Sequence, residues 1–253
     1  MGMTIYTILS LLGFALGINL FLYLFAWVWQ TDKLTDISYA GTFAIIAGAA
    51  YGVSSPTAMG GIALAFVLVW AVRLGGYLFY RIHVMGRDRR FDDIRAHPWR
   101  FLGFWVMQGL TCGILSIPFV GIMLAEAAAV TPVWVYVGLP LAATGWLIET
   151  IADAQKFNFK RRQPGAFMQQ GLWARVRHPN YTGELLFWWG LSLAAMGYMP
   201  VWLAAGGAVW ITFILIRFSG IPILEAQWKE KYGSDPEFAA YVARSWRLLP
   251  GIF

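Results

Sequence analysis

Apolar stretches of about 20 residues recur along this chain, and nearly all of its basic residues lie between them. A stretch of that length crosses the hydrocarbon core of a bilayer as one helix. Of the 19 Lys and Arg residues, all but Arg73 and Arg217 fall at alternate connections or in the C-terminal segment. Because cytoplasmic loops of membrane proteins collect Lys and Arg, this asymmetry indicates a chain that crosses a bilayer repeatedly.

We therefore predict an all-α membrane protein with seven transmembrane helices. The predicted spans are residues 4–29, 37–53, 59–82, 101–124, 133–155, 182–198 and 200–222. The basic connections place the N-terminus outside and the C-terminus in the cytoplasm. We expect two short amphipathic helices in the C-terminal tail. One ends at Gly233, and the other has Ser234 or Asp235 as its N-cap and Pro236 at its first position.

Composition and charge exclude several other classes of protein. The chain is 59% hydrophobic and 13% charged, far more apolar than a typical soluble domain. The net charge of +6 does not indicate nucleic-acid binding, because the basic residues flank apolar spans and suit lipid headgroups. The single cysteine, Cys112, excludes an internal disulfide and a cysteine-based metal cluster, and no metal is expected. The first residues lack a basic leader and a cleavage site, so no removable signal peptide is expected.

Several polar or ionisable residues lie inside or at the ends of the predicted spans, where each costs several kcal/mol unless it is paired or faces water. They are Asn19, Asp36, Tyr39, Arg73, Glu149, Asp153, Glu184 and Arg217. Glu149 and Asp153 are four residues apart and so share a helix face. As a set these residues indicate a polar cavity in the cytoplasmic half of the bundle. Mutual neutralisation of arginines and carboxylates is the structural alternative.

The basic connections carry a pattern that membrane topology does not require. Arginines alternate with Asp, Gly and aromatic residues in 86–95, and a Pro-Gly turn follows Lys160-Arg161-Arg162. Arg clusters suit phosphate groups, which they bind bidentately. Pro179 favours a helix start, where free backbone N–H groups attract an anion. These features predict a multiply phosphorylated ligand such as a nucleotide, although the chain has no dinucleotide fingerprint and no P-loop.

A longer stretch of the C-terminal half is more specific. It consists of Gly171-Leu172-Trp173, Arg177-His178-Pro179-Asn180-Tyr181-Thr182-Gly183-Glu184 and Trp188-Trp189-Gly190. This signature resembles that of the steroid 5-alpha-reductase family, in particular its bacterial membrane branch. The resemblance is good over residues 145–253 and weaker before them. Sterol C14 reductases share the core of the signature, and isoprenylcysteine methyltransferases share it more loosely.

The resemblance implies a seven-helix membrane enzyme that binds NADPH in its cytoplasmic half and reduces a carbon–carbon double bond conjugated to a ketone. The cofactor residues that it implies are Arg90, Arg95, Asp153, Arg161, Arg162, Arg177, His178, Asn180, Tyr181, Glu184 and Arg217. Residues 1–130 would form the substrate side and residues 131–253 the cofactor side of a single domain. The expected partners are a lipid-like substrate and membrane lipids in a bacterial inner membrane, with no obligate protein partner.

The substrate side departs from the family pattern. The steroid enzymes hold the ketone with a Gln-Glu pair on the second helix and a Tyr on the third. Here the second helix offers Asp36 and Tyr39, and the aligned position on the third helix is Trp70. A group that donates a hydrogen bond to a ketone must be protonated, which a tyrosine is at neutral pH. We therefore predict Tyr39, assisted by Asp36, as the catalytic pair.

Two other functions compete with a reductase. A methyltransferase that uses S-adenosylmethionine would share the signature and a later glutamate such as Glu225. Its ligand carries no phosphate, however, and such enzymes have a Glu-Glu pair where this chain has Glu225-Ala226. A transporter is a weaker alternative, because the sequence shows no pair of broken helices in two inverted halves.

Overall fold

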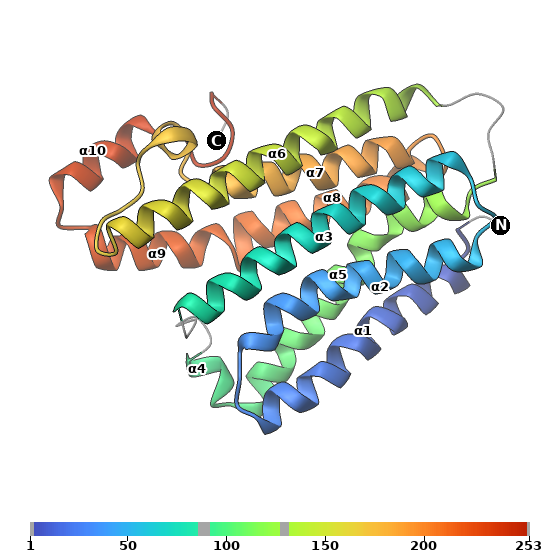
Figure 1. Ribbon diagram of the computed structural model, residues 1–253, viewed down its shortest axis with the longest axis horizontal. Helices are drawn as coiled ribbons and strands as arrows, with labels where there is room; N and C mark the ends of the chain where they lie inside the picture. The colour runs from blue at the N-terminus through green and yellow to red at the C-terminus, as the bar shows by residue number, and fades with distance from the viewer. Residues whose placement is uncertain (1–2, 86–91, 127–131, 252–253) are drawn as a thin grey trace. The chain divides into compact units, whose positions relative to one another are not determined.

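The computed structural model describes residues 3–85, 92–126 and 132–251, and most of them lie in α-helices (Figure 1). The helices are α1 (Ile5–Val28), α2 (Lys33–Val53), α3 (Ala58–Met85), α4 (Asp92–Arg95), α5 (Pro98–Leu124), α6 (Val133–Arg162), α7 (Pro179–Ala195), α8 (Val201–Phe213), α9 (Ile221–Tyr232) and α10 (Pro236–Arg244). A 3₁₀ turn covers Gly171–Ala174 and a π-helical turn covers Ile214–Phe218. Among the described residues the chain forms no β-sheet.

Five segments are long and apolar enough to cross a bilayer, which confirms the prediction of an all-α membrane protein. They are α1, α3, α5, α6 and the continuous stretch Val201–Tyr232. The predicted spans 37–53 and 182–198 correspond to α2 and α7. α7 has only 17 residues, and the Thr, Ser, Gly and Tyr residues of α2 lower its hydropathy. Seven spans and the orientation across the membrane therefore remain predictions.

Helix α6 extends beyond the predicted fifth span. The span is predicted to end at residue 155, whereas the helix continues to Arg162. Lys and Arg are good helix formers, and positive charge near a helix C-terminus is stabilised by the helix dipole. The basic run Lys160-Arg161-Arg162 therefore lies on the last turn of a helix, where the side chains point in different directions.

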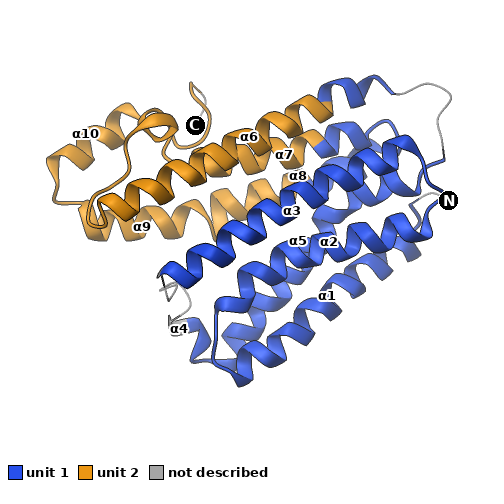
Figure 2. Ribbon diagram, viewed as in Figure 1, with its two compact units in different colours: residues 1–137, 191–207 blue, residues 138–190, 208–253 orange. Residues whose placement is uncertain are grey.

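The chain divides into two compact units (Figure 2). Unit 1 comprises Met1–Val137 and Leu191–Gly207, and unit 2 comprises Gly138–Gly190 and Ala208–Phe253. Helices α6, α7 and α8 each contribute residues to both. The signature and the C-terminal tail belong to unit 2.

In unit 1, helices α1, α2, α3 and α5 pack against one another. Two glycines one turn apart on α5, Gly109 and Gly113, face α1. A Cβ atom at Gly113 would lie 2.8 Å from Cδ2 of Leu12, and one at Gly109 would lie 3.1 Å from Cα of Leu16. Small residues four apart let two membrane helices approach closely, and this pair does so here.

A polar network ties the same helices together inside unit 1. Nε2 of Gln108, on α5, donates to Oδ1 of Asn19 at 2.9 Å and to Oγ of Ser38 at 2.7 Å. Asn19 is fully buried, and its Nδ2 donates to Oγ1 of Thr42 at 3.1 Å. These bonds satisfy polar groups on α1, α2 and α5 that the membrane interior could not satisfy.

In unit 2, helices α6 and α7 lie side by side in very close contact. A Cβ atom at Gly183 would lie 2.4 Å from the backbone N of Glu149, and one at Gly145 would lie 2.4 Å from the backbone N of Phe187. Further along, a Cβ atom at Gly190 would lie 2.4 Å from the backbone N of Ala142. Gly183 of the signature therefore has a packing role, since only glycine permits this approach.

The two predicted tail helices are confirmed. α9 ends at Tyr232 with Gly233 as its C-cap. α10 begins at Pro236, and its N-cap is Asp235, whose carboxylate accepts a hydrogen bond from the backbone N of Glu237 at 2.9 Å. Phe238 and Tyr241 are the buried residues of α10, and they pack against Tyr232 of α9.

Candidate functional site

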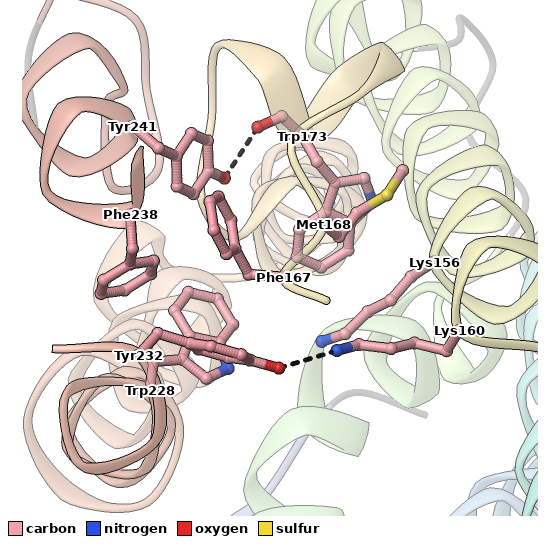
Figure 3. Close-up of a pocket in the computed structure, with 9 residues that line it drawn as sticks. All are labelled: Lys156, Lys160, Phe167, Met168, Trp173, Trp228, Tyr232, Phe238 and Tyr241. Carbon is pink, nitrogen blue, oxygen red and sulfur yellow. Dashed lines mark hydrogen bonds between the residues drawn. The ribbon is translucent and has the colours of Figure 1, made fainter. Parts of the chain in front are cut away.

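Two lysine side chains of α6 meet a group of aromatic rings in unit 2 (Figure 3). Lys156 and Lys160 are four residues apart and therefore project from the same face of the helix. Nζ of Lys160 donates to the carbonyl oxygen of Ala166 at 2.5 Å and to the hydroxyl of Tyr232 at 3.2 Å. Nζ of Lys156 lies 4.6 Å from the ring centroid of Trp173. An ammonium group at this distance from an aromatic face is held by a cation–π interaction.

These side chains line a small pocket. Its lining residues are Lys156, Lys160, Phe167, Met168, Trp173, Trp228, Tyr232, Phe238 and Tyr241. The nine include two cations and six aromatic rings but no Asp or Glu. The cavity volume is about 20 Å³, room for roughly one water molecule. A ligand as large as a nucleotide would therefore place at most a single atom, such as one phosphate oxygen, in this cavity.

The pocket walls are fixed by hydrogen bonds from two elements. Nε1 of the buried Trp173 donates to the carbonyl oxygen of Ala152 on α6 at 3.0 Å. The hydroxyl of Tyr241, on α10, donates to the carbonyl oxygen of Trp173 at 2.7 Å (Figure 3). Burial raises the pKa of Tyr241 to about 12, so that its hydroxyl stays protonated. The 3₁₀ turn Gly171–Ala174 is thereby held between α6 and α10.

A second constellation centres on the carboxylate of Glu225, on α9. Its Oε1 lies 3.3 Å from Nε of Arg177 and 3.6 Å from Nε2 of His178. Its Oε2 accepts a hydrogen bond from Nε of Arg247 at 3.0 Å, and a second nitrogen of the same guanidinium also bonds this oxygen. One carboxylate thus links the signature to the C-terminal segment. We call Glu225, Arg177, His178 and Arg247 the carboxylate hub.

His178 is enclosed by aromatic rings. Its imidazole is stacked on the ring of Trp228 with a centroid distance of 4.9 Å and an interplanar angle of 4°. On Tyr181 the distance is 5.7 Å and the angle is 11°. Burial holds the pKa of His178 below its ordinary value of 6.5, although the neighbouring Glu225 carboxylate opposes this shift. The imidazole is therefore neutral at physiological pH.

The predicted cofactor residues of unit 2 lie in three different settings. Arg177, His178 and Tyr181 lie in or next to the hub. Asp153, Asn180 and Glu184 lie elsewhere on α6 and α7. Arg161, Arg162 and Arg217 are exposed. The structure does not bring Arg161 or Arg162 into the pocket, whose cations are Lys156 and Lys160. Arg217 lies in the π-helical turn Ile214–Phe218.

Arg177 makes contacts that sequence reasoning did not predict. Besides Glu225, it donates from one terminal nitrogen to the carbonyl oxygens of Val242 at 3.0 Å and Ser245 at 2.5 Å. Much of its hydrogen-bonding capacity is therefore used within the protein, which favours a structural contribution from this residue.

The remaining predicted residues belong to unit 1. Arg95 forms an ion pair of 2.8 Å with Asp32, whereas Arg90 lies outside the described residues. Asp36 forms an ion pair of 3.3 Å with Arg81 of α3.

Tyr39, the predicted hydrogen-bond donor to the ketone, lies one turn after Asp36 on α2. Its ring packs edge-on against those of Phe43 and Trp70, with centroid distances of 5.1 and 6.1 Å. Trp70, which stands where the steroid enzymes have a tyrosine on the third helix, is thus a packing partner of Tyr39.

Sequence reasoning did not assign Lys156, Lys160, Glu225 or Arg247 to the cofactor site. Lys160 enters the sequence argument only within the run Lys160-Arg161-Arg162, whose two arginines are the predicted phosphate contacts. Glu225 was considered only as a methyltransferase feature. No group of three or more His, Cys, Asp or Glu side chains that could hold a metal ion occurs in residues 3–85, 92–126 and 132–251.

The comparisons with known proteins concern nearly the whole chain. No solved structure matches it. A family model described as "Protein of unknown function (DUF1295)" matches residues 22–245. Since this match covers most of the chain, the protein belongs to the DUF1295 family.

Proposed function

We propose that this protein is an NADPH-dependent membrane reductase of a carbon–carbon double bond conjugated to a ketone, acting on a steroid-like or other lipid-like substrate. The observation that carries the proposal is the pocket of unit 2, in which Lys156 and Lys160 meet aromatic rings. Two ammonium groups four residues apart suit a phosphate group, and flat rings suit the bases of a dinucleotide. The signature from Arg177 to Glu184, which resembles that of the steroid 5-alpha-reductases, lies in the same unit.

The small volume of the pocket limits what it would bind. Only one atom of the cofactor would enter it, and we assign that place to a phosphate oxygen held by Lys156 and Lys160. Nζ of Lys160 already donates to Ala166 and Tyr232, so one proton of the ammonium group remains for a ligand oxygen. The rest of the cofactor would extend outside the pocket towards Asn180 and Tyr181, in the first turn of α7.

The chain's own residues would have limited chemical tasks. When bound, NADPH supplies the hydride that goes to the β carbon of the enone. Tyr39 would donate a hydrogen bond to the ketone oxygen and so stabilise the negative charge that develops there. Asp36, ion-paired with Arg81, would orient Tyr39 from the same helix. A proton from an acid or water then completes the α carbon.

A binding experiment tests the cofactor. Detergent-solubilised protein is titrated with NADPH, NADH and S-adenosylmethionine. We expect saturable NADPH binding that weakens about 10- to 100-fold in Lys156→Gln and in Lys160→Gln, because each loses a charge-assisted interaction of about 1.5–3 kcal/mol. Lys229→Gln, at an exposed position of α9, is the matched control and should bind like the wild type. Saturable binding of S-adenosylmethionine but not of NADPH would overturn the proposal in favour of a methyltransferase.

A turnover experiment tests the catalytic pair. With an enone steroid as substrate, the double variant Asp36→Asn/Tyr39→Phe should lose turnover and keep the NADPH affinity of the wild type. Both substitutions are close to isosteric, so the packing of Tyr39 on Phe43 and Trp70 is retained. Unchanged turnover would rule the pair out without affecting the assignment of the cofactor.

A further inference from the structure

The C-terminal segment is paired with the backbone just before α7. The backbone N of Trp246 donates to the carbonyl oxygen of Arg175 at 2.8 Å. In return, the backbone N of Arg177 donates to Trp246 at 2.7 Å, and that of His178 donates to Arg247 at 3.1 Å. These bonds form a single parallel bridge, outside any sheet. So short a pairing needs additional contacts to persist.

Side chains supply those contacts. Oγ1 of Thr182, in the first turn of α7, donates to the carbonyl oxygen of Leu248 at 2.7 Å. Arg177 donates to the carbonyl oxygen of Ser245 at 2.5 Å. Ser245–Leu248 is thus fastened to both sides of Pro179, the first residue of α7. We call Ser245–Leu248 the strap.

The charge at the centre of this arrangement is that of Glu225. Arg177 reaches it from the loop before α7 and Arg247 reaches it from the strap, so the carboxylate neutralises two guanidinium groups at once. A neutral side chain of the same shape would leave those two cations facing each other. Their repulsion would act directly on the pairing between the strap and the loop.

The same carboxylate lies beside a stacked ring. The His178 imidazole is stacked on the rings of Trp228 and Tyr181. Its Nε2 lies 3.6 Å from Oε1 of Glu225, which is longer than a hydrogen bond. The backbone N of His178 bonds the strap at Arg247, so a displacement of the strap would move His178 and, through the stacked rings, the start of α7.

We propose that Glu225 is a positioning residue that fastens the strap to the loop before α7 and thereby orients His178 and Tyr181. The inference concerns the folded arrangement of unit 2. Only its consequence for ligand binding rests on the proposed function, through the place of Tyr181 beside the cofactor.

Glu225→Gln tests this proposal, because it keeps the shape of the side chain and removes its charge. Glu230→Gln, exposed on the same helix, is the matched control. Hydrogen exchange at the amides of Arg177, His178 and Trp246 should become at least about tenfold faster in Glu225→Gln and stay unchanged in Glu230→Gln. Arg247→Met removes the strap's own charge and should produce the same change, which covers the case in which Glu225→Gln does not fold.

A second readout reports ring orientation. The chain has 3 histidines, so labelled histidine gives few NMR signals. In the wild type the ring protons of His178 should be shifted upfield by the two stacked rings, and Glu225→Gln should reduce that shift. If neither the exchange rates nor the His178 signal changes in Glu225→Gln, the proposal is wrong.

NADPH affinity distinguishes this inference from the proposed function. If both hold, Glu225→Gln should weaken NADPH binding about tenfold or more. Faster exchange with unchanged NADPH affinity would support the role of Glu225 in positioning the strap and refute the place of Tyr181 beside the cofactor. If the wild type binds no NADPH, the proposed function fails, and the exchange and NMR results still decide the role of Glu225.

Discussion

Substituting Gly183 by alanine perturbs the closest helix contact of unit 2 with a single methyl group. The added Cβ would lie 2.4 Å from the backbone N of Glu149, 2.6 Å from the carbonyl oxygen of Gly145 and 2.7 Å from Cβ of Glu149. Ordinary contacts of a Cβ atom are 3.4–4 Å. Two of the three obstructing atoms belong to the backbone and cannot rotate away. Helices α6 and α7 must therefore separate by about 1 Å to accept the methyl group.

Such a separation would also loosen the other contacts between the two helices. Overpacking a well-packed core usually costs about 1–3 kcal/mol. Because the obstruction is backbone on backbone, we expect the upper end of that range. A loss of about 3 kcal/mol lowers the ratio of folded to unfolded protein roughly 100-fold. The free energy of unfolding can be measured by titrating mixed micelles with SDS and following tryptophan fluorescence.

The matched control is Gly206→Ala, on α8, where an added Cβ meets nothing within 4 Å. Alanine is the better helix former, so this variant should be as stable as the wild type or slightly more stable. If Gly183→Ala unfolds at the same SDS fraction as Gly206→Ala, the close approach of α6 and α7 does not explain this glycine.

Two further predictions concern the polar network and the buried histidine. Gln108→Leu removes the amide that donates to Asn19 and Ser38, so it should lower the free energy of unfolding by about 1–3 kcal/mol. Gln163→Leu, at an exposed position, is the control and should change the free energy of unfolding little. Equal effects of the two substitutions would contradict the role of the network. Because burial keeps the pKa of His178 below 6.5, the unfolded chain binds more protons there than the folded chain, so stability should fall as the pH drops from about 7 to 5. That pH slope should be smaller in His178→Gln than in the wild type, and an equal slope in the two proteins would refute the argument.

The helices were largely predictable because the information for them is local. Long apolar runs mark the helices, and Gly233, Asp235 and Pro236 mark the ends of α9 and α10 by the chemistry of their own side chains. The end of α6 was missed because hydropathy reports where a span leaves the lipid, which is not where the helix ends. The role of Gly183 could not be predicted, since it depends on α6 at Glu149, a distant part of the sequence.

The candidate site was only partly predictable. The signature singles out His178 and Tyr181, which the structure places beside Glu225 and Trp228, and their role at a cofactor stays a prediction. The hub could not be predicted, because Glu225 is 48 residues from Arg177 and 22 residues from Arg247. Pairings over such separations are set by how helices and tail pack, and no local pattern reports them.

The basic residues can serve membrane topology or ligand binding, and the direction of each side chain, rather than its charge, distinguishes these two explanations. Sorting of membrane topology responds to positive charge near a span wherever the side chain points, and exposed Arg161 and Arg162 satisfy it. Ligand binding requires convergence, and on the same helix Lys156 and Lys160 converge on the aromatic pocket. A methyl donor with a cationic sulfonium would meet two ammonium groups there, which is unfavourable, whereas a phosphate would be attracted. This difference in electrostatic attraction is why we propose a phosphorylated ligand rather than a methyl donor for the pocket.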